Sequence, residues 1–214
     1  MIRVLLADDH LMVRTGLKEI LMATGDMLVA GEATNGHETL QAIREGEYDI
    51  VVLDMSMPGR NGIELIKLIK AERPKLRILV LSMHSEKQYA VRAVKAGASG
   101  YLTKESAADA LVTAIRRVAA GGASISPETA ERLVLDSGRS GDEAPHKRLS
   151  DREFEVFRMI AAGRALTEIA GALSLSVKTI STHKTHILQK IGVSNQTGLV
   201  HYAIRHQLID EPDR

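Results

Sequence analysis

Four short apolar runs in the first half of the chain each end on a residue suited to phosphate chemistry. The runs are residues 3–7 before Asp8 and Asp9, 50–53 before Asp54, 78–81 before Ser82, and 101–103 before Lys104. If these runs are strands of one parallel sheet, their carboxyl ends lie side by side. Three carboxylates, a hydroxyl and an ammonium then meet at the edge where open α/β sheets bind their ligands.

Strand-like and helix-like patterns alternate over the first 120 or so residues. The strand patterns are continuous apolar runs rather than alternating ones, which favours strands buried on both faces, as in parallel sheets. We therefore predict a doubly wound five-stranded α/β domain. The expected strands are 2–7, 27–33, 50–53, 78–81 and 100–102; the expected helices are 11–22, 36–44 (capped by Asn35), 63–70, 89–96 and 107–119.

The second half of the chain is predicted to be helical after a polar connection. Residues 124–135 form a candidate short helix, and 136–145 contain no apolar side chain larger than Ala, which is typical of a flexible linker. The following helices are predicted at 151–162, 168–173, 177–190 and 197–206, with caps at Ser150, Thr167 and Ser176 and a capping box completed by Glu153. The predicted domains are 1–122, a linker over 123–147, and a second domain over 148–214.

Composition excludes several classes of protein. The 214 residues include no Cys and no Trp, so disulfides, thiolate catalysis and zinc–thiolate sites are excluded and the core must be largely aliphatic. No apolar stretch approaches the roughly 20 residues that a membrane span needs. The sequence also starts with a strand pattern rather than a secretory signal. These features predict a soluble cytoplasmic protein of two domains.

The acidic residues at the predicted sheet edge would repel one another. A divalent cation removes this repulsion, and Mg²⁺ prefers carboxylate and carbonyl oxygens. Such a site favours a phosphoryl group, and one carboxylate can act as the nucleophile that forms an aspartyl phosphate. Asp54 is best placed for this, because it follows the central strand; Lys104 and Ser82 can each bind a phosphoryl oxygen. Taken singly, an Asp pair after a strand is usually a helix cap and a loop Lys is usually solvated. His10 is given no ligand role.

A cationic stretch marks the second domain. Residues 169–209 contain no Asp or Glu but hold Lys178, Lys184, Lys190, Arg205 and four His. On a helical wheel of 177–191 the isoleucines gather on one side and short polar side chains on the other. Short hydrogen-bonding groups flanked by cations suit the DNA major groove, although a solvated face is the plain alternative. With the preceding helix and a three-residue turn, the pattern predicts a helix-turn-helix.

The first 120 or so residues resemble the receiver domain of bacterial two-component response regulators, a flavodoxin-like fold. The resemblance rests on Leu5-Leu6-Ala7-Asp8-Asp9-His10, Leu53-Asp54-Met55-Ser56-Met57-Pro58-Gly59, Leu79-Val80-Leu81-Ser82 and Gly100-Tyr101-Leu102-Thr103-Lys104. It implies that Asp54 accepts phosphate from a histidine kinase. It also implies a Mg²⁺ ion held by Asp9, Asp54 and the backbone carbonyl of Ser56, with Asp8 acting through water.

The same resemblance makes Ser82 and Tyr101 a switch pair, in which the hydroxyl moves to the phosphoryl group and the ring turns inward. In one departure, Glu105 stands where many receivers have Pro. The cis peptide that is usual at that position is therefore left open.

The second domain is similar to the four-helix LuxR-type DNA-binding domain, which makes the chain similar to NarL/FixJ-type response regulators. The similarity rests on Leu149-Ser150-Asp151-Arg152-Glu153, Thr167-Glu168-Ile169-Ala170 and Ser176-Val177-Lys178-Thr179-Ile180-Ser181-Thr182-His183. It implies that Ser181, Thr182 and Thr185 face base edges, and that the phosphate backbone is contacted by Lys178, His183, Lys184 and Lys190. Many relatives have Lys at the position of Ser181 and Asn-Lys at the position of Leu166-Thr167, so base preference should differ and a phosphate contact is in question.

The resulting hypothesis is a transcription factor controlled by phosphorylation of Asp54. The resemblance implies an inactive state in which the receiver covers the DNA-binding helix. The helix over 197–206 is a candidate homodimer face, with core packing as an equal alternative. Two other functions stay open: a receiver that never uses phosphate and is regulated by a partner protein, and a Mg²⁺-dependent phosphatase with an aspartyl nucleophile.

Overall fold

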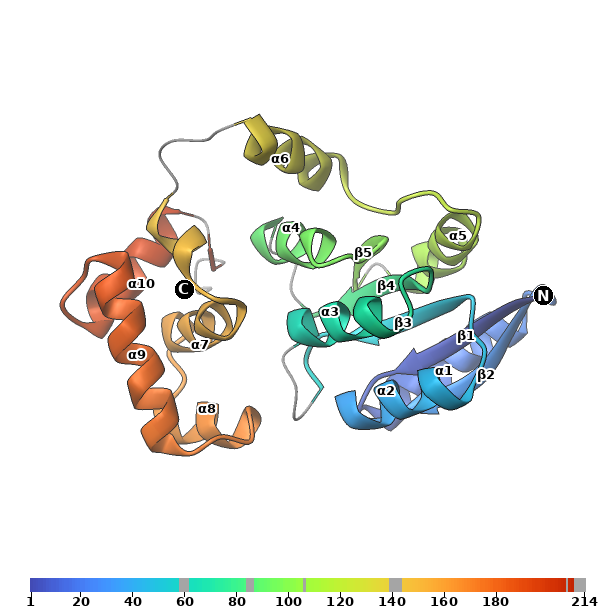
Figure 1. Ribbon diagram of the computed structural model, residues 1–214, viewed down its shortest axis with the longest axis horizontal. Coiled ribbons are helices and arrows are strands. Elements are labelled where there is room, and N and C mark those ends of the chain that lie inside the picture. Colours follow the sequence, from blue (N-terminus) through green and yellow to red (C-terminus); the bar gives the residue numbers. More distant parts are fainter. Residues whose placement is uncertain (58–61, 84–86, 106, 139–143, 207, 210–214) are drawn as a thin grey trace. The chain divides into compact units, whose positions relative to one another are not determined.

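The computed structural model describes residues 1–57, 62–83, 87–105, 107–138, 144–206 and 208–209. The chain divides into two compact units, Met1–Leu133 and Val134–Arg214, and each is described by itself. Within the described residues, every strand belongs to the first unit and the second is helical (Figure 1). No helix among these residues is both long and apolar enough to cross a membrane.

The first unit is built on a parallel sheet with the strand order β2-β1-β3-β4-β5. This order reverses direction at β1 and β3, as in doubly wound folds, and it confirms the predicted fold class. The elements in chain order are β1 Ile2–Ala7, α1 Leu11–Met22, β2 Met27–Ala33, α2 Gly36–Glu45, β3 Ile50–Asp54, α3 Gly62–Glu72, β4 Arg77–Ser82, α4 Lys87–Lys95, β5 Gly100–Thr103 and α5 Ala107–Ala119.

The register of the sheet places the ends of four strands level with one another. Ala7 pairs with Leu53, so Asp8, which follows β1, and Asp54, which ends β3, lie at the same height in the sheet. Ser82 pairs with Thr103, the last residue of β5, and Lys104 follows directly after it. The polar residues that follow these strands therefore meet at one edge, as the sequence predicts.

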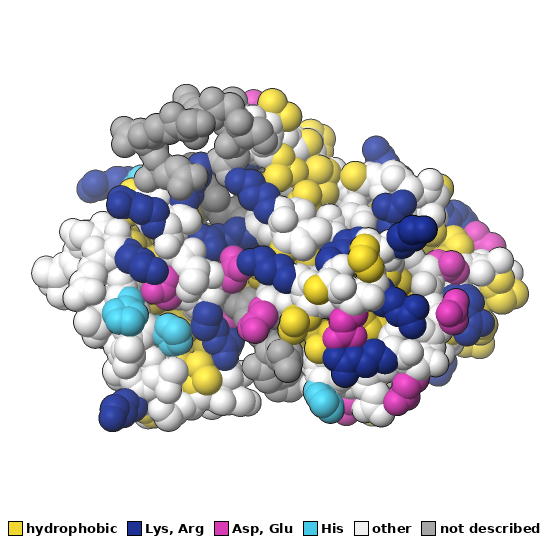
Figure 2. Space-filling view, in the orientation of Figure 1, with side chains coloured by type: hydrophobic (Ala, Val, Ile, Leu, Met, Phe, Trp, Pro, Cys, Tyr) yellow, Lys and Arg dark blue, Asp and Glu magenta, His cyan; other side chains and the backbone are white. Residues whose placement is uncertain are grey.

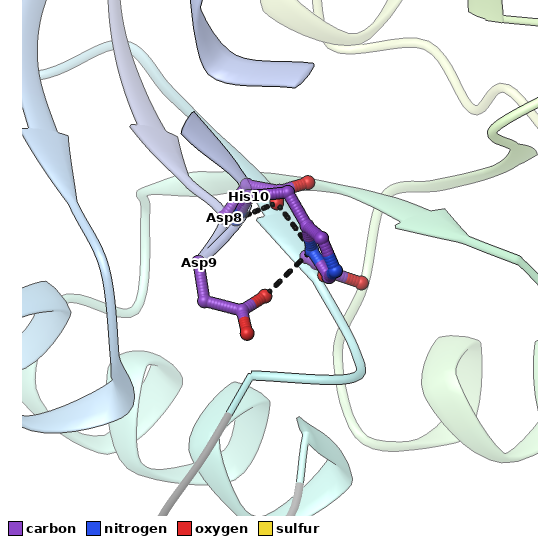
Figure 3. Close-up of side chains that lie close together, drawn as sticks. Asp8, Asp9 and His10 are labelled. Atoms are coloured by element: carbon purple, nitrogen blue, oxygen red, sulfur yellow. Dashed lines mark hydrogen bonds and ion pairs between the residues drawn. The ribbon is translucent and has the colours of Figure 1, made fainter. Parts of the chain in front are cut away.

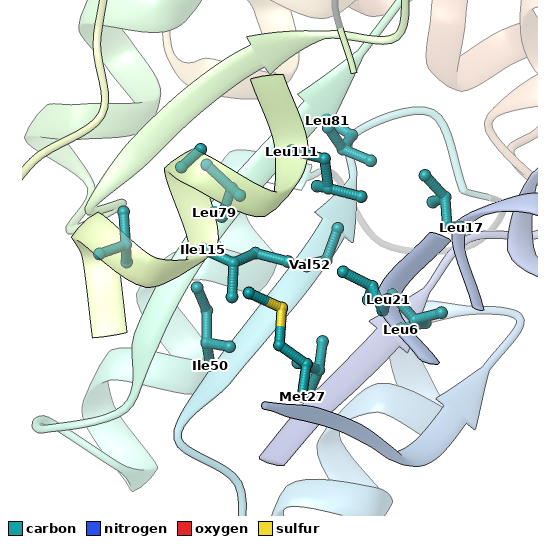
Figure 4. Close-up of a cluster of buried hydrophobic side chains, with 13 residues drawn as sticks. Leu6, Leu17, Leu21, Met27, Ile50, Val52, Leu79, Leu81, Leu111 and Ile115 are labelled. Atoms are coloured by element: carbon teal, nitrogen blue, oxygen red, sulfur yellow. The ribbon is translucent and has the colours of Figure 1, made fainter. Parts of the chain in front are cut away.

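The core lies on both faces of the sheet. Every residue of β3 is buried, which explains its unbroken apolar sequence. On one face, side chains of α1 and α5 pack on the central strands (Figure 4); this cluster includes Leu17, Leu21, Leu111, Ile115, Val52 and Leu79. On the other face of the sheet, the isoleucines of α3 are also fully buried. The core is aliphatic, as the low aromatic content requires.

The connection after α5 differs from the expected helix over 124–135. Ser124 forms a parallel bridge with Gly100, and the Tyr101 N–H donates to the Ser124 carbonyl at 2.8 Å. The helix α6 begins only at Pro127 and continues to Gly138, so it includes the first three residues of the predicted flexible linker. Most of the remaining linker, 139–143, lies outside the described residues, and Pro145–Arg148 form a 3₁₀ helix, η1.

The second unit packs four helices around aromatic and aliphatic side chains. The helices are α7 Asp151–Ala161, α8 Leu166–Ala172, α9 Val177–Ile191 and α10 Gln196–Arg205. Both Phe residues of the chain, Phe154 and Phe157, are fully buried with ring centroids 6.1 Å apart. Ile180 and Ile187 of α9 face this core, while Ser181 and Thr182 are exposed. The four predicted helices are thus present, with ends shifted by one or two residues.

Most of the predicted caps are present. The Ser150 side chain accepts from the Glu153 N–H and the Glu153 carboxylate accepts from the Ser150 N–H, which is the predicted capping box. Ser176 is the N-cap of α9, as the sequence predicts. The prediction that Thr167 opens α8 is wrong, because the helix begins at Leu166, two residues earlier than expected. Its N-cap is Ala165, whose N–H donates to the Glu168 carboxylate at 3.0 Å.

Candidate functional site

Three carboxylates meet at the carboxyl edge of the sheet. Asp8 and Asp54 are buried and Asp9 is exposed (Figure 3 shows the residues after β1). Side-chain oxygens of these residues and a nitrogen of His10 all lie within 4.8 Å of one another. Asp8 Oδ1 also accepts from the His10 N–H at 2.8 Å, which fixes the turn after β1. The structure thus brings together the three acids that the sequence singled out.

Lys104 bridges the two buried carboxylates. Its Nζ lies 2.7 Å from Asp8 Oδ2 and 2.9 Å from Asp54 Oδ2. Burial raises the pKa of the Asp54 carboxyl above its ordinary value, and the hydrogen bond from Lys104 opposes that effect. Burial alone lowers the pKa of Lys104, but its hydrogen bonds to Asp8 and Asp54 outweigh this and the pKa is raised. Lys104 therefore stays charged beside a carboxylate that is more basic than an exposed Asp.

His10 is a member of the cluster that sequence reasoning missed. Its Nδ1 lies 2.9 Å from Asp9 Oδ1 and 3.3 Å from Asp8 Oδ1 (dashed in Figure 3). The side chain is 60% exposed, so His10 lies on the solvent side of the acidic cluster. Its position directly after the two acids is the only sequence signal, and a His at a helix start commonly has no such role.

The remaining residues predicted for this site lie around Asp54. The Ser56 N–H donates to Asp54 Oδ1 at 3.0 Å, and Ser56 itself is exposed. Ser82 is fully buried, and its carbonyl accepts from the Lys104 N–H at 2.8 Å. Tyr101 is 8% exposed and borders a cavity of about 270 Å³ between α4, β5 and the start of α6. The Lys104–Glu105 peptide is trans, like the other peptide bonds of the described residues.

The donor set fits a magnesium ion. The cluster offers carboxylate oxygens from two strand ends within one small space, and oxygen is the ligand atom that Mg²⁺ prefers. Asp9 is exposed, so a metal there could keep several of its waters, as Mg²⁺ does. In the structure the single positive charge of Lys104 offsets only part of the negative charge of the two buried carboxylates.

The second candidate site is the exposed face of α9. Among the predicted DNA contacts, Lys178, Ser181, Thr182 and Thr185 are exposed, while the isoleucines of the same helix are buried. The hydroxyls of Thr182 and Thr185 donate to carbonyls one turn earlier, at 3.0 and 3.1 Å, and keep their oxygens available as acceptors. Lys, Arg and His side chains are visible on this unit in Figure 2.

The other three predicted contacts of α9 interact within the second unit. Lys190 Nζ lies 2.6 Å from Glu153 Oε2, and Lys184 Nζ donates to Gln196 Oε1 at 3.0 Å. His183 is half-buried; burial, and to a lesser degree nearby Arg152, lowers its pKa. The lowered pKa favours the neutral form of His183. Lys190 links the end of α9 to the start of α7.

Comparisons with known proteins match both units. Residues 4–116 match the profile of the "response regulator receiver domain", and residues 147–203 match that of the "bacterial regulatory proteins, luxR family". The chain is 36% identical over 98% of its length to the response regulator GacA of Pseudomonas protegens, of which 99% is covered. It is likewise 36% identical to the response regulator UvrY of Escherichia coli, covering 97% of this chain and 96% of that one.

A solved structure extends the similarity to a DNA complex. RcsB from Salmonella enterica serovar Typhimurium, bound to promoter rprA in the presence of the phosphomimetic BeF3⁻, is 31% identical. The match has a TM-score of 0.65 and covers 94% of this chain and 97% of RcsB.

Proposed function

The chain belongs to the two-component response regulators that join a receiver domain to a LuxR-family DNA-binding domain, and we propose that phosphorylation of Asp54 controls its binding to DNA. It is thus a DNA-binding regulator of transcription rather than an enzyme acting on a pool of substrates. The matched ranges support assigning 1–122 to the receiver, 123–147 to the linker and 148–214 to the DNA-binding domain.

The contact between Lys104 and the buried carboxylate of Asp54 carries this proposal. An Asp54 oxygen forms the bond to phosphorus while the bond between phosphorus and the donor nitrogen of a histidine kinase breaks, which leaves the histidine with the electron pair. The Lys104 ammonium, now 2.9 Å from Asp54 Oδ2, then binds an oxygen of the transferred group. Burial of Asp54 keeps bulk water away from the acyl phosphate.

A metal ion completes this site in the proposal. Asp9, Asp54 and the backbone carbonyl of Ser56 would hold Mg²⁺, with Asp8 acting through water. Bound there, Mg²⁺ neutralises charge that builds up on the phosphoryl oxygens. The self-modification and its reversal by water are the only reactions we assign to the chain.

We further propose that Ser82 and Tyr101 transmit the modification. Ser82 ends β4 at the edge that holds Asp54, and Tyr101 lies on the neighbouring strand β5. The Ser82 hydroxyl would move to the phosphoryl group and the Tyr101 ring would turn inward. Tyr101 is also hydrogen-bonded through its backbone to Ser124 after α5, which connects the switch strand to the linker.

The output in this proposal is double-stranded DNA bound by α9. Ser181, Thr182 and Thr185 would face base edges, while Lys178, His183, Lys184 and Lys190 would face phosphates. Lys184 and Lys190 would then exchange Gln196 and Glu153 for phosphate oxygens. We expect a homodimer on DNA, through α10, and a cytoplasmic location, where bacterial DNA lies.

The test is treatment of the full chain with acetyl phosphate and Mg²⁺, followed by mass analysis. We expect one phosphoryl group on the wild type and none on Asp54→Ala, because the nucleophile is removed. Wild type that stays unmodified would contradict the phosphorylation proposal and favour a receiver regulated by a partner protein. Steady turnover of phosphate esters would instead favour the phosphatase.

A further inference from the structure

A buried arginine lies behind the acidic cluster and has no part in the mechanism above. Arg14 is on the second turn of α1, and its side chain is only 10% exposed. A buried guanidinium is costly unless it has well-placed acceptors. The two acceptors of the Arg14 guanidinium show which parts of the chain it holds together.

The first acceptor is the backbone of an acidic residue at the site. Arg14 Nη1 donates to the Asp8 carbonyl at 2.7 Å. That carbonyl stands between the two acids that follow β1, because the peptide bond it belongs to joins Asp8 to Asp9. The Asp8 N–H donates to the Ala33 carbonyl of β2 at 3.0 Å. Arg14 therefore binds the Asp8 backbone where the hydrogen bonding between β1 and β2 ends.

The second acceptor is on a neighbouring strand. Arg14 Nε lies 3.3 Å from Glu32 Oε2, and Glu32 belongs to β2. Glu32 is also bound by Lys18, whose Nζ is 2.7 Å from Oε1. The planar guanidinium can reach the carbonyl and the carboxylate together because its donors have a fixed fork geometry, which an ammonium lacks.

We propose that Arg14 is a positioning residue that holds the Asp8–Asp9 backbone in the orientation required for Mg²⁺ binding, with Glu32 fixing the guanidinium. Asp8 is held at four points: its N–H by β2, its carbonyl by Arg14, and its two carboxylate oxygens by His10 and Lys104. Of these four contacts, the one from Arg14 is made to the peptide group that Asp8 shares with Asp9. Mutation of partners that orient metal ligands in this way typically weakens metal affinity by about 10–100-fold. This inference rests on the proposed Mg²⁺ site.

The test measures Mg²⁺ binding to the full chain by calorimetry, with the metal alone as ligand. We expect Arg14→Lys to weaken Mg²⁺ affinity about tenfold, in the range found for residues that orient metal ligands. Glu32→Gln should weaken it less, because Arg14 keeps the Asp8 carbonyl. The matched control is Lys18→Ala, which removes the other cation bound to Glu32 without touching Asp8; its affinity should equal that of the wild type.

A second readout separates positioning from loss of structure. In acetyl phosphate labelling, Arg14→Lys should need more Mg²⁺ for half-maximal labelling but reach the wild-type rate at saturation. If Arg14→Lys fails to fold, Glu32→Gln carries the test, since its side chain is 35% exposed. Unchanged Mg²⁺ affinity in the folded variants, or equal weakening in Lys18→Ala, would overturn the inference. Wild type that binds no Mg²⁺ would instead overturn the proposed metal site.

Discussion

At the scale of single residues, the chain uses a few charged side chains for more than one contact. Lys104 pairs with two carboxylates, and Glu153 both caps α7 and pairs with Lys190 of α9. The sequence predicts that Lys104 lies at the same sheet edge as these acids, because strand ends in a parallel sheet converge, but it does not predict the two ion pairs themselves. It predicts only the capping half of the second, since the approach of Lys190 depends on how α7 and α9 cross.

Glu153 gives a prediction on the pH dependence of stability. Burial acts to raise its pKa, but the hydrogen bonds from Lys190 and Ser150 outweigh it, so the pKa lies below the ordinary value of 4.5. A lowered pKa stabilises the fold above pH 4.5, and this contribution is lost as the pH falls through the folded-state pKa. We expect Glu153→Gln to lower the free energy of unfolding by about 1 kcal/mol at pH 7, because the amide can keep the cap but loses the ion pair with Lys190.

Chemical denaturation of the DNA-binding domain at several pH values measures this effect. The difference between the wild type and Glu153→Gln should shrink as the pH falls below 4.5 and through the lowered folded-state pKa of Glu153, because the wild-type carboxylate then becomes protonated. A difference that is independent of pH would show that the charge of Glu153 does not contribute. The matched control is Glu168→Gln, which alters the cap of α8 without a Lys190 contact.

At the scale of elements, apolar periodicity predicts the helices and strands well, and errors occur where tertiary contacts decide. The helix expected from residue 124 begins at Pro127, because Ser124 instead bridges to Gly100 of β5. Because Ser124 and Gly100 are distant in the sequence, no local pattern predicts this bridge. Likewise α8 begins at Leu166 rather than after Thr167, because Glu168 reaches back to the Ala165 N–H.

The helix α9 gives a prediction on DNA recognition. Thr182→Ala should relax sequence preference, because Thr182 is exposed on the proposed base-facing side. Lys178→Ala should weaken binding to all sequences and reduce the salt dependence by about one unit of slope, as expected for one phosphate contact. Binding assays with selected and random DNA at several salt concentrations separate the two effects. Lys18→Ala removes an equal charge from the receiver unit and should change neither; identical behaviour of all three variants would mean that α9 is not the contact helix.

At the scale of the whole molecule, the two units divide chemistry and output. The receiver unit contains the acidic cluster, and the second unit contains the stretch from residue 169 to residue 209 that has no Asp or Glu. The sequence predicts this division because chemistry at the sheet edge and cationic character at α9 are both visible in the residues. It does not predict the role of Arg14, whose partners come from a strand 18 residues away and from a backbone carbonyl.

The central claim is that phosphorylation of Asp54 changes the affinity of α9 for DNA. The most direct measurement is the dissociation constant for a DNA site selected from a random library, before and after treatment with acetyl phosphate and Mg²⁺. We expect the wild type to bind about tenfold more tightly after treatment, within the usual range of coupling between sites, and Asp54→Ala to show no change. Equal affinities of phosphorylated and unphosphorylated wild type would contradict the claim.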